Sequence, residues 1–146
     1  MPRIGKTLLQ QLQTNLLAMI SLVVALSSLS YNTWRNEQTE ANRNQRTAAF
    51  EMIHKLNELQ EIVFYLHYDK DIDNKGNPRR GWVTLLTIKD LAQIMQEPIP
   101  KQAENLALVW QQNWESLEQD KLSLERVTNE IDRLRHTSLN ILARLK

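Results

Sequence analysis

The sequence contains one uncharged run, Asn15-Leu-Leu-Ala-Met-Ile-Ser-Leu-Val-Val-Ala-Leu-Ser-Ser-Leu-Ser30, that is apolar on all sides of a helix. Its apolar core, Leu16 to Leu29, is short for a membrane-spanning helix, which needs about 20 residues. The run can be extended at both ends to residues 7–31 without meeting a charge, a Gly or a Pro. We therefore expect a transmembrane helix over residues 7–31, preceded by a short basic tail over residues 1–6.

The residues around this core are typical of a membrane boundary. Tyr31 and Trp34 follow the span, where amphipathic aromatic side chains favour the interface. The amides upstream must lie at the headgroups or face a partner helix, because an unpaired amide is costly in hydrocarbon. These amides are Gln10, Gln11, Gln13 and Asn15.

Two alternatives to an anchor stay open. Residues 1–27 also fit a cleaved signal peptide, with Arg3 and Lys6 as its basic start and with Ala25-Leu26-Ser27 as its small-x-small cleavage site. The run could also be a buried helix of a soluble protein. We favour the anchor, because amphipathic helix signals resume directly after the span with no turn residues between.

The orientation is weakly encoded, because Lys and Arg are nearly balanced across the span. The tail carries Arg3 and Lys6, whereas all 17 acidic residues and the other basic residues follow the span. We expect a cytoplasmic N-terminus and an extracytoplasmic C-terminal domain, which is periplasmic if the cell is Gram-negative. A stripe of small residues could let two copies pack closely in lipid as a homodimer. It consists of Ala18, Ser21, Ala25 and Ser28.

The composition predicts an all-α fold and excludes several classes of function. Only three Gly and four Pro in 146 residues favour long helices, and the lack of Cys excludes disulfides and thiolate metal sites. Positive and negative charges are interleaved, so no basic face suggests nucleic-acid binding. After the span we expect a polar helical stalk over residues 32–48 and a helical bundle domain over residues 49–146.

The apolar periodicity predicts an antiparallel bundle of about four helices. We expect its first helix to be continuous with the membrane helix and to end near Tyr68, before a loop over residues 69–81. The second helix is expected from Trp82 to Met95, the third from Pro100 to about Leu117, and the last after Asp120 as N-cap. Whether the third and fourth helices are fused stays open. The first helix has a heptad-like, coiled-coil seam of Ala49, Met52, Leu56, Leu59, Val63 and Leu66, widened by Phe50, Ile53 and Ile62. The second helix should bury Trp82, Leu85, Leu86, Ile88, Leu91, Ala92 and Met95.

No catalytic or cofactor motif is recognisable. Asp69, Asp71 and Asp73 are weak candidates for a cation site, but they do not fit an EF-hand loop, and a solvated turn is the preferred interpretation. His54 with Glu58, and Asp132 with His136, are spaced as surface helix pairs and not as a metal or protease signature. We expect no metal, no cofactor and no enzymatic activity.

Trp82, Trp110 and Trp114 are a heavy aromatic load for a small bundle. They are candidates for binding a partner, against the alternative that they pack in the core. We expect a membrane-anchored helical bundle that acts by helix–helix interaction with another envelope protein or with itself, as a scaffold, assembly or accessory subunit. The alternatives are an extracytoplasmic bundle that senses a small ligand and, if residues 1–27 are cleaved, a secreted helical protein.

Overall fold

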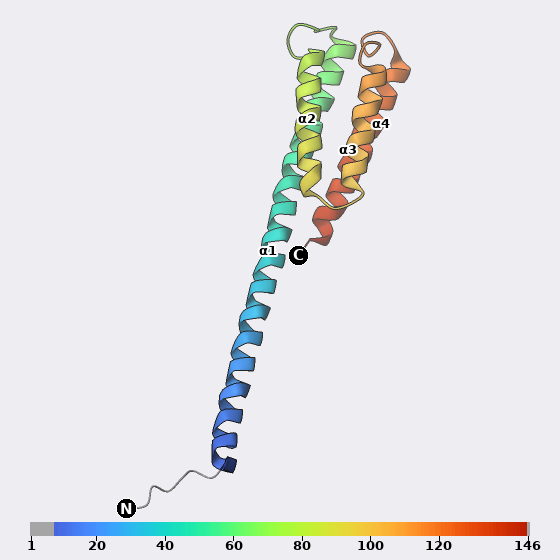
Figure 1. The fold of residues 1–146 in the computed structure, drawn as a ribbon. Coiled ribbons are helices and arrows are strands. Elements are labelled where there is room, and N and C mark those ends of the chain that lie inside the picture. Colours follow the sequence, from blue (N-terminus) through green and yellow to red (C-terminus); the bar gives the residue numbers. More distant parts are fainter. Residues whose placement is uncertain (1–7, 146) are drawn as a thin grey trace, which may run out of the picture. The chain divides into compact units, whose positions relative to one another are not determined.

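The structure, a computed structural model, describes residues 8–145, with side chains from residue 15 onward. The expected all-α class is confirmed: the described residues form four helices and no strand. The expected tail and the start of the span at Thr7 lie outside the described residues. The helices are α1 (Leu8–Tyr68), α2 (Pro78–Ile94), α3 (Ile99–Asn113) and α4 (Lys121–Arg144) (Figure 1).

Helix α1 runs without interruption for 61 residues, so the expected continuity of the apolar helix with the first bundle helix is confirmed. The chain nevertheless divides into two compact units, with the boundary between Ala41 and Asn42. In the first unit every described side chain, from residue 15 to residue 41, is exposed. All the buried side chains lie in the second unit, beginning at Ala48.

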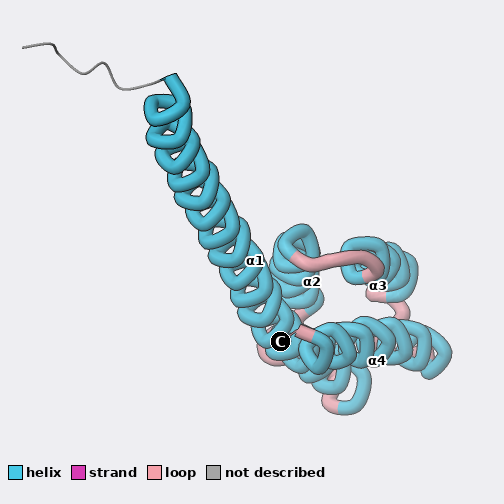
Figure 2. The backbone as a smooth tube through the Cα atoms, turned by 90° about the horizontal axis from the view of Figure 1, so that it is seen from below, coloured by secondary structure: helices cyan, strands magenta, loops and turns pink. Residues whose placement is uncertain are grey.

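The second unit is an antiparallel bundle in which each helix runs opposite to the one before it (Figure 1), and the view from below shows its four helices around a common centre (Figure 2). A polar contact joins each pair of neighbouring helices, α1 with α2, α2 with α3, α3 with α4, and α4 with α1. The arrangement is therefore a closed four-helix bundle. These polar contacts are Glu58 with Arg80 at 4.0 Å, Lys89 with Glu104 at 3.5 Å, Arg126 with Asn113 at 3.5 Å, and Gln60 with Thr128 at 3.4 Å.

The heptad-like seam of α1 forms one wall of the core, since each of its six positions is at most 2% exposed. Two residues that we expected to face inward do not. Phe50 is 61% exposed and Leu86 is 60% exposed. The preceding residue, Ala49 or Leu85, is buried in each case. Because consecutive residues of a helix point about 100° apart, Phe50 and Leu86 turn away from the core. The buried stripe is therefore narrower than the apolar pattern suggested.

Side-chain caps set the ends of the helices. Helix α2 begins earlier than expected, because the Asn77 side chain accepts a hydrogen bond from the backbone N–H of Arg79 at 2.9 Å and Pro78 occupies the first turn. Helix α3 ends at Asn113, short of Leu117, and turns follow up to Asp120. Asp120 caps α4 as expected, so α3 and α4 are separate helices.

Candidate functional site

The apolar part of α1 is the first candidate site. Its most apolar 18-residue window has a mean hydropathy of 1.6 and no buried residue, so this helix is long and apolar enough to cross a membrane. Between Leu16 and Leu29 the large apolar side chains are 52–68% exposed. Such a surface requires lipid, or another helix, to cover it.

One hydroxyl in this part of α1 is satisfied within its own helix, and two aromatic residues follow the span. The Ser28 hydroxyl donates to the carbonyl of Val24 at 2.8 Å, so its hydrogen bond is made within its own helix. Tyr31 and Trp34 lie one turn apart with ring centroids 6.1 Å apart, and both are exposed. The small-residue stripe is fully accessible: Ala18, Ser21, Ala25 and Ser28 are all exposed.

The three tryptophans of the bundle have different environments. Trp110 is fully buried, and its indole Nε1 has no hydrogen-bond partner among the described residues. Trp82 is half-buried and meets the Trp110 ring edge to face, with centroids 6.4 Å apart. Trp114 is also half-buried, just beyond the end of α3. Trp110 is therefore a core side chain in this structure, whereas Trp82 and Trp114 are partly buried and pack against the core.

Trp82 and Trp114 line one cleft at the end of the bundle where the α1–α2 and α3–α4 connections lie. Its volume is about 670 Å³, which is in the range of small-molecule sites. The charged side chains around it are Asp73, Arg79, Glu115 and Glu118, and Leu66, Ile72, Asn77 and Pro78 complete its lining.

A smaller groove of about 180 Å³ separates α2 from α3. Leu86 and Leu108 line it from opposite helices, with the Lys89–Glu104 ion pair on its rim. Leu108 is 55% exposed, and Val83 on the same part of α2 is 64% exposed. Trp82 lines this groove as well as the cleft, so the two features adjoin.

The acidic loop is built as a turn. The Asp71 carboxylate accepts hydrogen bonds from the backbone N–H groups of Lys75 at 3.1 Å and Asn74 at 3.2 Å, and from the Asn74 amide at 3.0 Å. These bonds, that from Lys75 first, hold the pKa of Asp71 below its usual value. Asp69 and Asp73 are exposed, and no group of three or more potential metal ligands occurs in the described part of the chain.

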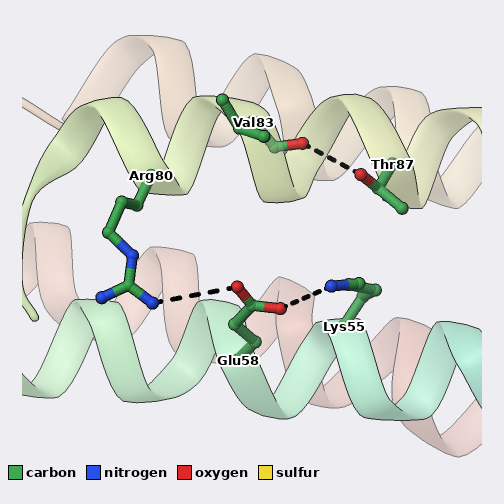
Figure 3. A network of polar contacts seen from close by, with 5 residues as sticks. All are labelled: Lys55, Glu58, Arg80, Val83 and Thr87. Atoms are coloured by element: carbon green, nitrogen blue, oxygen red, sulfur yellow. Dashed lines mark hydrogen bonds and ion pairs between the residues drawn. The ribbon is translucent and has the colours of Figure 1, made fainter.

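Glu58 and Asp132, which the spacing pairs with His54 and His136, make their ion pairs with other residues. Glu58 bonds to Lys55 at 2.7 Å and approaches Arg80 of α2 (Figure 3), and the hydrogen bond from Lys55 is the main cause that lowers the pKa of Glu58. Asp132 pairs with Arg135.

The contact that His67 makes could not be expected from any sequence pattern. Its Nδ1 lies 2.6 Å from the carbonyl oxygen of Leu117, fifty residues away, so this nitrogen must carry the proton and donate. The contact fastens the end of α1 to the α3–α4 connection, beside the cleft.

Comparison of the chain with protein-family models, curated proteins and solved structures found no match. The protein is an all-α bundle with one helix that is long and apolar enough to cross a membrane.

Proposed function

We propose that this chain is a single-pass membrane protein whose helical bundle acts non-enzymatically by binding another protein, as a scaffold, assembly or accessory subunit. The observation that carries the proposal is the uncovered apolar part of α1. At about 1.5 Å per residue, residues 8–31 extend for about 36 Å. That length exceeds the roughly 30 Å of a hydrocarbon core, so the helix can cross it with some tilt.

The distribution of charge supports an exported bundle domain. Lys and Arg near a span are kept on the cytoplasmic side, whereas acidic residues contribute little to orientation. Because Arg35, Arg43 and Arg46 follow the span, this rule is nearly balanced, and we base the orientation on the short basic tail with Arg3 and Lys6 before a domain that is close to neutral. We therefore place the bundle outside the cytoplasm, where it meets other proteins of the cell envelope.

The exposed apolar side chains of the bundle support binding of a partner. Leu86 and Leu108 line one groove and are both more than half exposed, and Val83 of α2 is 64% exposed. Grouped apolar side chains on a soluble surface are typical of an interaction site. The small stripe around Ala25 offers a second, in-membrane contact, either to a partner helix or to a second copy of the chain.

Membrane insertion is tested with two matched substitutions of exposed leucines. Leu22→Arg places a charge in the middle of the span, which costs about 2.5–3.5 kcal/mol on insertion scales, and should release the protein from carbonate-washed membranes. Leu108→Arg makes the same change on the bundle and should leave the protein in the membrane. Equal behaviour of the two variants would contradict the anchor.

Orientation is tested with a reporter fused after Lys146 that is active only outside the cytoplasm. An active, full-length, membrane-bound fusion supports the proposal. A shortened and soluble fusion identifies residues 1–27 as a cleaved signal peptide, and an inactive membrane-bound fusion places the bundle in the cytoplasm.

Partner binding is tested with a photo-crosslinking residue at Leu86 in the full chain in membranes. We expect one discrete adduct that Leu108→Glu abolishes. The same crosslinker at Glu125, an exposed polar position of α4, should give none. Adducts of equal intensity from both positions, or adducts that persist with Leu108→Glu, would contradict binding through the groove.

A further inference from the structure

The cleft between the two loop connections has a composition that the anchoring and partner-binding proposal does not use. It combines two half-buried indoles, Trp82 and Trp114, with three carboxylates and a single guanidinium. The carboxylates belong to Asp73 on the first connection and to Glu115 and Glu118 on the second. Negative charge therefore exceeds positive charge around a partly apolar hollow.

The charges of the cleft are not neutralised within the bundle. None of the ion pairs in the described part of the chain involves Asp73, Glu115, Glu118 or Arg79. These three carboxylates also do not come together closely enough to chelate a metal ion. Carboxylates that are spaced around a cleft suit a larger cation whose charge is spread over several atoms or carried on an apolar stem.

The indoles supply the second half of such a site. A guanidinium or ammonium group is attracted to the face of a tryptophan, and the attraction grows when water is excluded. Trp82 and Trp114 come from different elements and converge on one cleft of about 670 Å³. This volume accommodates an arginine-sized ligand, since small-molecule pockets range from about 300 to 1,000 Å³.

We propose that this cleft binds an organic cation of the alkylguanidinium or alkylammonium class, with its charged group between the carboxylates of Glu115 and Glu118 and the indoles of Trp82 and Trp114. Arg79 and the start of α2 at Pro78 place positive charge along the α2 side of the cleft. The cation is therefore held by the α3–α4 connection, and Asp73 has the smaller part. The site does not depend on whether the chain is anchored in a membrane.

The test uses the full chain in a non-ionic detergent, with ¹⁵N-labelled tryptophan side chains that give one indole N–H signal each. N-acetylarginine amide is the probe, and N-acetylcitrulline amide is its uncharged control of nearly the same shape. We expect the arginine probe to shift the signals of Trp82 and Trp114 while that of Trp34 stays unchanged. Trp82→Phe and Trp114→Phe assign the two signals.

Substitutions at the carboxylates separate charge recognition from simple packing. Glu115→Gln with Glu118→Gln should weaken binding by about tenfold, whereas Glu125→Gln on α4 should change it less than about twofold. The single variants Glu115→Gln and Glu118→Gln give the same comparison if the double variant does not fold.

The proposal is overturned if the arginine probe shifts neither signal, if the citrulline probe shifts both signals equally well, or if Glu125→Gln is as harmful as the cleft substitutions. Agmatine, a free cation without peptide groups, distinguishes the source of the ligand. Tighter binding of agmatine indicates a free small molecule, and tighter binding of the blocked arginine indicates a side chain presented by a polypeptide; both outcomes support the site.

Discussion

Gly81 gives the most informative test of how the bundle is packed. It is buried in the first turns of α2, where the ring of Trp110 lies directly against it. A Cβ atom added at this position would overlap Cζ2 and Cη2 of Trp110 and would lie 3.3 Å from Cε2. The ring has little room to withdraw, because Trp110 is fully buried and packs against the Trp82 ring in a T-shaped arrangement.

Gly81→Ala combines two opposing effects. At an open helical position the change to Ala would stabilise the protein by roughly 0.5–1 kcal/mol. Overpacking a core costs about 1–3 kcal/mol, and overlap with two atoms of an enclosed ring belongs in the upper part of that range. We therefore expect a net loss of about 1–2 kcal/mol. For a bundle of this size that loss lowers the melting temperature by about 5–15 °C.

The assay is thermal unfolding of the full chain in detergent, followed by near-ultraviolet circular dichroism, which reports the packing of the buried tryptophans. Trp110→Leu removes the overlapping ring, and Gly81→Ala should be neutral or stabilising in that background. The coupling between the two substitutions should then be about 2 kcal/mol. The reasoning is refuted if Gly81→Ala raises the melting temperature on its own, or lowers it equally in both backgrounds.

Three further predictions concern the connections between helices. Gly76→Ala should destabilise the protein more than Gly81→Ala, because the new Cβ would meet backbone atoms, Leu66 N at 2.5 Å and Asp71 O at 2.6 Å. Thermal unfolding measures the loss. A Leu66→Ala background should not restore stability, because that substitution leaves the Leu66 backbone in place. Lys70 has a φ of 56° after the end of α1, so Lys70→Gly should raise the unfolding free energy in urea titrations by roughly 1 kcal/mol; a loss would contradict the strain. The hydrogen bond from the Ser123 hydroxyl is the main cause that lowers the pKa of Asp120 below its ordinary value, so the folded state binds this proton less readily than the unfolded state. Its stabilising effect is therefore complete above the unfolded pKa and is lost as the pH falls through the lower folded value, and melting curves of Asp120→Asn from pH 6 to pH 2 should fall less steeply than those of the wild type.

The helical architecture could be predicted because its signals are local. The seam from Ala49 to Leu66 repeats at heptad spacing, and every one of its members is buried. Asp120 was identified as an N-cap from its position before a periodic segment, and it accepts bonds from the N–H groups of Leu122 and Ser123. Periodicity alone could not set the width of each buried face, which depends on how neighbouring helices approach. Phe50 therefore looked internal and is exposed.

The cleft could not be predicted, because its residues are distributed over segments that only the fold brings together. Trp82 and Trp114 are predicted as candidates for binding because they are aromatic, but the sequence does not predict that they line the same cleft. In the structure α3 ends at Asn113, and Trp114 lines a cleft with Trp82 of another element. Glu115 and Glu118 belong to no recognisable motif. Two glutamates at this spacing look the same in a sequence whether they lie on a solvated helix surface or line a cleft. The site forms where the α1–α2 and α3–α4 connections lie side by side. Long-range contacts hold this end of the bundle together, such as the one between His67 near the end of α1 and Leu117 of the α3–α4 connection.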